Sequence, residues 1–351
     1  DRKLVEIVKA TYFNPKIVVI DETTTALSQE GREELYKHME RIRKSGNTVI
    51  FISHDLPEII EKSDTITILR DGVYIDTVKS KDVNENDLKK LMVGREVTGD
   101  YYRSDYGEKI SDEVVLSAKH VTVPGLIEDV SFDLHKGEIL GFGGLSESGM
   151  HEIGKAIFGA SYDREGTVEL ADGTQINDIP TAIKHSIAYT SKDRDNESVV
   201  LNQSIGDNIC LPSLDELSGP AHLISDKKKK DFANKFAKQM SVKMVDVNQF
   251  VSNLSGGNKQ KVVLARWIGK DSDIVVLDSP TRGIDIKVKQ DIYQLMNQMR
   301  KNGKSIIMIS EELMELIGMC DRIMIMKDGK ISGELERDQN LDENGLITMM
   351  V

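Results

Sequence analysis

The sequence has few of the residues that mark several classes of protein. It contains only two cysteines and one tryptophan among 351 residues, and aromatic residues make up 5%. Cys210 and Cys320 lie far apart and in no metal-ligand spacing, so we expect two free thiols in a reducing compartment. No apolar run is long enough to cross a bilayer, and the opening stretch DRKLVEIVKA lacks the pattern of a signal peptide.

Basic residues are also in the minority. The chain has 46 Lys and Arg against 58 Asp and Glu, a net charge of −12. This balance argues against a general nucleic-acid-binding surface, although it does not exclude a local basic patch. Apolar residues at 39% and charged residues at 30% are typical of a soluble globular protein, and the length is sufficient for two domains.

An internal repeat organises the chain. Asp21 and Asp278 lie 257 positions apart, and the same offset relates several further pairs without a gap: Tyr36 and Tyr293, Gly46 and Gly303, Ser53 and Ser310, Asp64 and Asp321, Asp71 and Asp328, Gly72 and Gly329. Each copy has a buried strand, an acidic turn, an amphipathic helix, a glycine turn and another buried strand. This alternation predicts a mainly parallel sheet covered by helices.

The two copies differ in extent. At this offset Asp1 corresponds to Asn258, whereas the second copy starts near Asp112, so roughly 146 residues of the second copy have no counterpart in the first. We therefore predict that residues 1–98 are the later part of a first domain, that residues 99–112 are an exposed polar linker, and that residues 113–351 are a second, near-complete domain. We expect the chain to be a fragment of a longer protein.

The strongest motif lies between residues 254 and 285. LSGGN, from Leu254 to Asn258, is a glycine-rich turn at the start of a helix, where several backbone N–H groups bind an anion. An apolar run from Ile274 to Leu277 then ends in Asp278. Such a run is typical of a buried parallel strand that delivers a carboxylate to the carboxyl end of a sheet. Together the two patterns predict a nucleotide site.

These residues resemble the signature and Walker B motifs of the ABC ATPases. With TRGID at residues 281–285, the LSGGN variant is similar to the tandem-domain ATP-binding subunits of sugar importers of the ribose/galactose/xylose type. The resemblance implies α/β, P-loop NTPase-like domains with a parallel-sheet core, a small antiparallel sheet and a helical subdomain, present here as one partial and one near-complete copy. It also implies ATP and Mg²⁺ as cofactors.

The resemblance assigns roles to residues of the first copy. It implies that Asp21 holds Mg²⁺, that Glu22 polarises the attacking water, and that His54 contacts the γ-phosphate. Because ABC domains pair head to tail, it further implies that one composite hydrolytic site is completed by the second copy. The residues concerned are Ser255, Gly256, Gly257 and Asn258.

The second copy departs from the pattern at its own P-loop. Alignment with GxxGxGK[ST] places Met150 at the lysine and His151 at the hydroxyl residue, while Ser279 stands at the position of Glu22 and Glu311 at that of His54. Lys192 takes the Q-loop position. The loop retains a backbone cradle without its fixed positive charge, and its candidate nucleotide contacts are Gly144, Ser148, Gly149 and Asp278. These losses predict that this site does not hydrolyse ATP and leave nucleotide binding open.

The resemblance implies an ATP-hydrolysing subunit that powers carbohydrate import at the cytoplasmic face of the cell membrane. Its implied partners are transmembrane permease subunits and, indirectly, an extracytoplasmic sugar-binding protein, with no nucleic-acid partner and no membrane insertion. We expect this chain alone to be inactive, because neither copy has a lysine-bearing P-loop. Two alternatives remain: a soluble tandem ABC protein that acts on ribosomes or nucleic acid, and a non-enzymatic ABC remnant.

Overall fold

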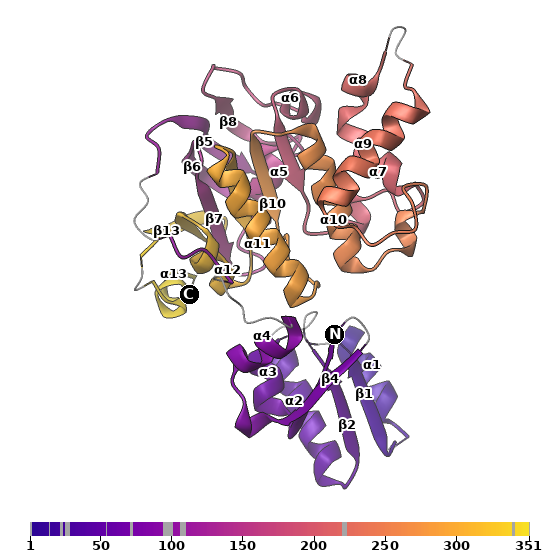
Figure 1. Cartoon of the computed structure of the whole chain (residues 1–351). Helices are drawn as coiled ribbons and strands as arrows, with labels where there is room; N and C mark the ends of the chain where they lie inside the picture. The colour runs from indigo at the N-terminus through magenta and orange to yellow at the C-terminus, as the bar shows by residue number, and fades with distance from the viewer. Residues whose placement is uncertain are drawn as a thin grey trace. The chain divides into compact units, whose positions relative to one another are not determined.

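The computed structural model describes most of the chain, and the elements are labelled in Figure 1. The described residues are 2–13, 15–21, 24, 29–53, 55–70, 73–93, 101–105, 110–219, 223–338 and 341–350. They form two compact units, one of residues 1–100 with 285–287 and the other of residues 101–284 with 288–351.

The first unit consists of short strands and helices in alternation. Its elements are α1 (Arg2–Thr11), β1 (Ile17–Asp21), α2 (Gln29–Lys44), β2 (Thr48–Ile52), α3 (Leu56–Lys62), β3 (Thr65–Arg70), β4 (Val73–Lys79), the 3₁₀ turn η2 (Ser80–Asp82) and α4 (Glu85–Val93). β1 and β2 are parallel, with Asp21 opposite Ile52, and β3 and β4 form an antiparallel hairpin. The core between β1 and α2 is small and contains Val18, Ile20, Leu35 and Met39.

The second unit is built on a six-stranded, mainly parallel sheet with the order β13-β12-β7-β11-β10-β9. Its strands are β7 (Ile139–Gly144), β9 (Ile187–Thr190), β10 (Ile274–Asp278), β11 (Ser305–Ile309), β12 (Arg322–Lys327) and β13 (Lys330–Glu336). A smaller antiparallel sheet has the order β6-β5-β8, formed by β5 (Val114–Val123), β6 (Ile127–His135) and β8 (Glu165–Leu170). The predicted parallel core and small antiparallel sheet are confirmed, as are the strands expected near Val114 and Ile127.

Helices cover both faces of the six-stranded sheet. α5 (Met150–Ile157) packs on one face, since a Cβ atom at Gly154 would lie 2.9 Å from Ile309 and 3.4 Å from Val276. α12 (Leu313–Met319) packs on the other face, since a Cβ atom at Gly141 of β7 would lie 3.2 Å from Leu316. Glycine at these positions therefore allows close contact between helix and sheet. The remaining helices on this part of the unit are α6 (Ile179–Lys184), α11 (Ile286–Lys301) and α13 (Glu343–Met350).

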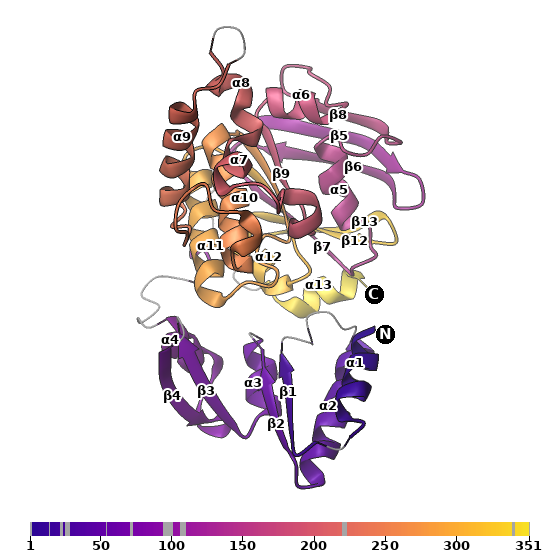
Figure 2. The same cartoon turned by 90° about the vertical axis from the view of Figure 1, so that its right-hand side faces the viewer.

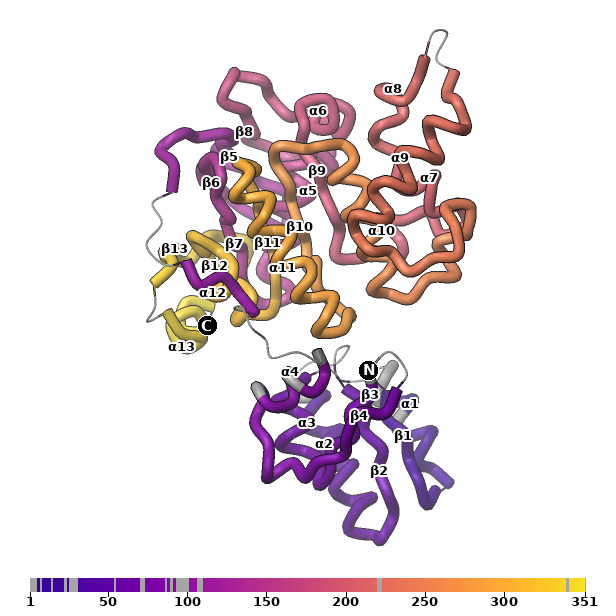
Figure 3. The backbone as a smooth tube through the Cα atoms, viewed as in Figure 1, coloured from indigo at the N-terminus to yellow at the C-terminus, as the bar shows by residue number. Residues whose placement is uncertain are grey.

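A separate group of helices lies to one side of the sheet. Figures 1 and 2 show α7 (Ile205–Cys210), α9 (Asp226–Gln239) and α10 (Gly256–Lys270) packed together, with α8 (Leu214–Leu217) next to them. The 3₁₀ turns η4 (Leu211–Ser213) and η6 (Val251–Asn253) connect this group. The helix-rich segment expected between Ile205 and Val251 is thus observed. Figure 3 follows the same course of the backbone and shows that α13 lies beside the β12–β13 hairpin.

Secondary structure repeats between the two units at the offset found in the sequence. β1, α2, β2, α3, β3 and β4 begin and end 257 positions before β10, α11, β11, α12, β12 and β13, respectively. Side-chain contacts repeat as well: Glu58 accepts hydrogen bonds from Thr24, Ser53 and Tyr36, and Glu315 accepts them from Thr281, Ser310 and Tyr293.

One face of the β1–β2 pair differs from its counterpart in exposure. Val19 is 59% exposed, whereas Val276 at the matching position of β10 is completely buried. Ile17, Ile50 and Ile52 lie on this same exposed face. In the second unit α5 covers the corresponding face, which explains why the same apolar strand pattern gives different burial in the two units.

The predicted linker at residues 99–112 is partly wrong. Tyr101–Asp105 belongs to the second unit, where the Tyr101 and Tyr102 rings pack against Tyr293. Arg103 is buried and donates to the Met319 carbonyl at 2.8 Å and to Asp321 at 2.7 Å. Aromatic packing and buried charge pairing therefore hold a segment whose lack of periodicity had indicated exposure. Residues 94–100 and 106–109 of this region lie outside the described part.

Candidate functional site

The turn that corresponds to a P-loop lies between β7 and α5. Gly149 precedes α5 with a φ of 91°, and a Cβ atom there would lie 2.6 Å from the Leu126 carbonyl oxygen, so glycine is required. Gly144 ends β7 directly beside Ser148, whose hydroxyl is buried and has no hydrogen-bond partner among the described residues. Met150, at the position of the phosphate-binding lysine, is completely buried in the core. The turn therefore requires glycine at residue 149 and presents no cation from residue 150.

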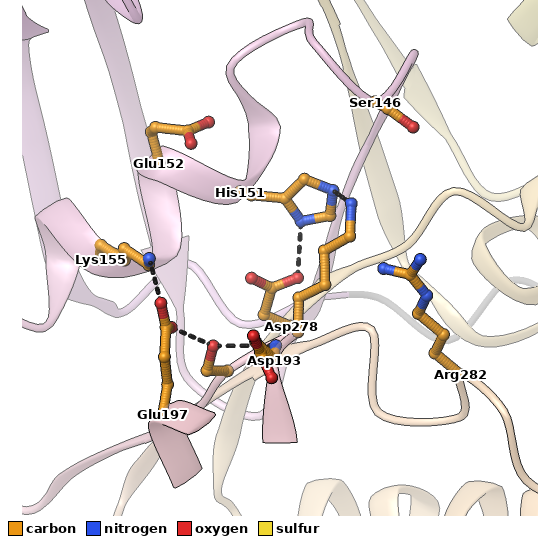
Figure 4. A pocket seen from close by; sticks show the side chains of 10 residues that line it. Ser146, His151, Glu152, Lys155, Asp193, Glu197, Asp278 and Arg282 are labelled. Carbon is orange, nitrogen blue, oxygen red and sulfur yellow. Dashed lines mark hydrogen bonds and ion pairs between the residues drawn. The ribbon is translucent and has the colours of Figure 1, made fainter. Parts of the chain in front are cut away.

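His151 stands at the position that the P-loop pattern gives to Ser or Thr (Figure 4). Its Nδ1 lies 2.7 Å from Asp278 Oδ1, as Figure 4 shows, and its Nε2 lies 3.0 Å from Lys192 Nζ. The same Nε2 lies 3.4 Å from Glu311 Oε1. Lys192 Nζ is 2.6 Å from the same Glu311 oxygen, which also accepts from Ser146 Oγ at 2.9 Å. Four sequence-predicted positions of the second copy are thus in direct contact, which the sequence alone did not indicate.

This network perturbs the acid–base properties of its members. Burial lowers the pKa of His151, but the hydrogen bonds with Asp278 and Glu311 outweigh burial and raise the pKa above its ordinary value. The hydrogen bond from His151 and the proximity of Lys192 hold the pKa of Glu311 far below its ordinary value, despite burial. Burial raises the pKa of Tyr189, whose hydroxyl lies 3.5 Å from Asp278. Glu311 is therefore ionised over the whole physiological pH range.

A pocket of about 540 Å³ lies beside this network. Its lining is formed by Ser146, His151, Glu152, Lys155, Ser191, Lys192, Asp193, Glu197, Asp278 and Arg282. Four carboxylates face three Lys and Arg side chains and one histidine, so the lining carries no positive surplus for a triphosphate. Mg²⁺·ATP does not fit these residues. The Asp278 carboxylate is already hydrogen-bonded to His151, and the lysine of the network, Lys192, is paired with the ionised carboxylate of Glu311, so neither group is available to a metal ion or a phosphate.

Ser279 follows the end of β10, at the position that Glu22 holds in the first copy. It adopts a φ of 49°, donates its backbone N–H to Ile309 O at 2.8 Å, and has its hydroxyl 3.3 Å from Asp278. A serine hydroxyl at neutral pH does not act as the base that a carboxylate provides. The ends of β1 and β10 therefore share one strand register, but the residue that follows β10 supplies no carboxylate.

The signature turn, Ser255–Asn258, leaves backbone N–H groups at a helix N-terminus without a side-chain cap from Ser255. Ser255 precedes the 15-residue helix α10, and its hydroxyl accepts from Asn258 Nδ2 at 2.9 Å instead of capping the helix. Asn258 in turn accepts from the Lys243 backbone N–H at 2.7 Å. The first N–H groups of α10, including those of Gly256 and Gly257, therefore have no side-chain cap from Ser255, which suits an anion at a helix N-terminus.

Of the three candidate residues in the first unit, only Asp21 is described by the structure. It ends β1 at the carboxyl edge of the parallel pair, opposite the end of β2. Glu22 and His54 lie outside the described residues. Their neighbours Thr24 and Ser53 are joined through buried Glu58, with hydrogen bonds of 3.2 and 2.7 Å. Glu58 was not predicted from the sequence, although its recurrence as Glu315 at the 257-residue offset was a detectable signal.

The fold and these motifs define an ATP-binding cassette of the ABC transporter class. The family model described as "ABC transporter" matches residues 127–282. A dimeric bacterial ABC transporter cassette shares the fold, with a TM-score of 0.56 and 22% identity over 64% of this chain and 99% of that one. A nucleotide-free cassette from an ABC transporter gives a TM-score of 0.57 at 17% identity, over 68% of this chain and 99% of that one.

Sequence relatives specify the group within that class. The ribose import ATP-binding protein RbsA of Lactococcus lactis subsp. lactis is 41% identical, across 98% of this chain and 69% of the relative. The xylose import ATP-binding protein XylG of Thermoanaerobacter pseudethanolicus is 42% identical, across 96% of this chain and 68% of the relative. The chain belongs to the family of sugar-import ATP-binding proteins of ABC transporters.

Among the described residues, no helix combines the length and apolar character needed to span a membrane.

Proposed function

We propose that this chain belongs to an ATP-binding subunit that powers carbohydrate import through a membrane permease. The single observation that supports this most strongly is identity of about 40% to ribose and xylose import ATP-binding proteins along almost the whole chain. The expected partners are the transmembrane permease subunits and, through them, an extracytoplasmic sugar-binding protein. The expected location is the cytoplasmic face of the cell membrane, as a peripheral subunit.

The two units are proposed to be copies of one nucleotide-binding domain, of which the first is partial in this chain. The shared 257-residue offset of six consecutive elements supports this, as does the recurrence of the Tyr–Glu–Ser–Thr hydrogen bonds. Duplication explains why the apolar pattern of β1 and β2 matches that of β10 and β11 even where burial differs. Residues 1–98 and 113–351 remain the proposed domains, with Tyr101–Asp105 held by the second.

The hydrolytic site is proposed to combine groups from both copies. Asp21 would hold Mg²⁺, Glu22 would orient and polarise the attacking water, and His54 would donate to the γ-phosphate. The signature turn would supply the Ser255 hydroxyl and the backbone N–H groups of its glycines to the same phosphate. Bound Mg²⁺ would neutralise the charge on the phosphate oxygens. The printed sequence contains no P-loop with lysine, so turnover would require a P-loop from outside these residues.

The repeat provides a matched pair of substitutions to test this assignment. In the complex with its permease, Glu22→Gln should reduce sugar-stimulated ATP turnover by about 10²-fold or more, the contribution of a positioned base. Ser279→Ala, at the matching position of the other copy, should leave turnover within about twofold, because the serine hydroxyl supplies no base. The opposite ranking of the two variants would refute the assignment, and turnover independent of sugar and permease would refute the proposed function.

A further inference from the structure

The pocket beside the second P-loop turn is crossed by contacts between the chain's own charged groups. His151 comes from α5, Lys192 follows β9, Asp278 ends β10, and Glu311 follows β11. Contacts of 2.7 Å between His151 and Asp278 and of 2.6 Å between Lys192 and Glu311 form two pairs. His151 Nε2, 3.0 Å from Lys192 and 3.4 Å from Glu311, joins the two pairs. We call these four residues the substitute network. In a nucleotide site of intact chemistry such segments would face a ligand, whereas here they face one another.

The substitute network satisfies its charges in either form of the histidine. When His151 is neutral with its proton on Nδ1, Nε2 accepts from Lys192 at 3.0 Å. When His151 is protonated, Nε2 donates to Glu311 at 3.4 Å, and Lys192 keeps its own contact with Glu311. Both carboxylates therefore retain a partner, so the network does not depend on a bound cation.

Lys192 lies in a segment that also contacts the signature helix. The 191–198 segment contains the π-helical turn η3 (Arg194–Ser198) and is closed by a 3.1 Å bond from the Ser191 N–H to Ser198 Oγ. On its other side, Asp195 pairs with Lys259 of α10 at 3.2 Å, and the Ser198 carbonyl accepts from Arg266 of α10 at 2.6 Å. The guanidinium of Arg194 lies over the signature turn, 3.2 Å from where a Cβ atom of Gly256 would be.

We propose that the substitute network takes the place of Mg²⁺·nucleotide in the second copy and, through the 191–198 segment, holds the signature turn in one arrangement. Lys192 and Glu311 are then positioning residues for Ser255–Asn258. The pocket itself takes no Mg²⁺·ATP. This inference does not depend on which solute is transported or on whether the first copy hydrolyses ATP.

Hydrogen exchange of the backbone measures both parts of the proposal on this chain. In the unaltered chain, millimolar Mg²⁺·ATP should leave exchange at residues 144–151 and 191–198 unchanged. In Lys192→Met, exchange should become about tenfold or more faster at residues 191–198 and in the first turns of α10, since a charge-assisted partly buried contact is lost. The β5–β6 hairpin should keep its protection, which shows that the unit remains folded.

Lys304→Met is the matched control. The Lys304 side chain is 19% exposed, and its Nζ lies 2.8 Å from Asp273. The Lys192 side chain is similarly buried, at 26% exposed, and its Nζ lies 2.6 Å from Glu311. It should not alter exchange at the 191–198 segment or the signature turn. Glu311→Gln should accelerate hydrogen exchange at residues 191–198 as Lys192→Met does. The double variant should exchange no faster there than the more strongly affected single variant, because both substitutions remove the same contact.

Three results would overturn the proposal. Protection of residues 144–151 by Mg²⁺·ATP would show that the pocket binds nucleotide. Faster exchange at residues 191–198 with unchanged exchange at residues 255–262 would show that the segment does not hold the signature turn. Equal effects of Lys192→Met and Lys304→Met would show that any lost lysine pair loosens this region. A failure to support sugar import would affect none of these measurements.

Discussion

Glu315 offers a sharp test of what holds the second unit together. This carboxylate on α12 is 1% exposed and accepts hydrogen bonds from the hydroxyls of Thr281, Tyr293 and Ser310, with Ser310 Oγ at 2.8 Å. Lys289 Nζ lies 3.4 Å from the same group. One side chain thus joins the turn after β10, helix α11 and the end of β11. Glu315→Ala should therefore be strongly destabilising.

The magnitude follows from the groups that lose their partner. Truncation leaves buried hydroxyls unpaired and removes a carboxylate from a nearby lysine. Each hydrogen bond to a charged group is worth roughly 1.5–3 kcal/mol, but such losses are not additive, and breaking a buried pair typically costs about 3–5 kcal/mol. We therefore expect the free energy of unfolding to fall by about 3–5 kcal/mol.

The assay uses the only tryptophan of the chain. Trp267 lies buried in α10, so its fluorescence during urea unfolding reports on the second unit. With an m-value of about 3 kcal/mol per molar urea, the midpoint should fall by about 1–1.7 M. Glu169→Ala removes a carboxylate whose pairing with Lys119 at 3.4 Å is exposed, and it should shift the midpoint by at most about 0.3 M. A shift for Glu315→Ala no larger than for Glu169→Ala would refute the reasoning.

Three further outcomes follow from the second unit. Gly318→Ala should lower the free energy of unfolding by about 1–3 kcal/mol, because the new Cβ atom would lie 2.3 Å from the Tyr102 ring. An unchanged urea midpoint would contradict the packing of Tyr102 against α12. The pKa of His151 is raised above 6.5, so its stabilising contribution is complete below pH 6.5 and is lost as pH rises through the folded-state pKa. His151→Gln should therefore flatten the decline in urea midpoint above pH 6.5, and an unaltered pH profile would exclude this linkage. Burial raises the pKa of the Cys210 and Cys320 thiols, to about 11 for Cys210. A disulfide reagent should therefore modify the native chain far more slowly than the urea-unfolded chain. Rapid labelling of the native chain would contradict the buried positions of the two thiols.

The sequence by itself determined the order of elements and the identity of the motifs. These features depend on local chemistry: apolar runs that end in an acid, glycines where the chain must turn, and a spacing that recurs after 257 residues. Asp21 and Asp278 were placed correctly at strand ends for this reason. The substitutions at Met150, His151, Ser279 and Glu311 were also visible as departures from a pattern.

Only the tertiary structure decided which of these side chains meet. Lys192 and Glu311 are 119 positions apart, and nothing in either neighbourhood indicates that an amine and a carboxylate replace a ligand between them. Likewise Val19 and Val276 occupy matching strand positions, yet exposure depends on whether a helix covers that face. Tyr101–Asp105 has no periodicity and still packs, because its partners come from distant parts of the chain. Long-range packing and charge pairing, which no local pattern encodes, account for these differences.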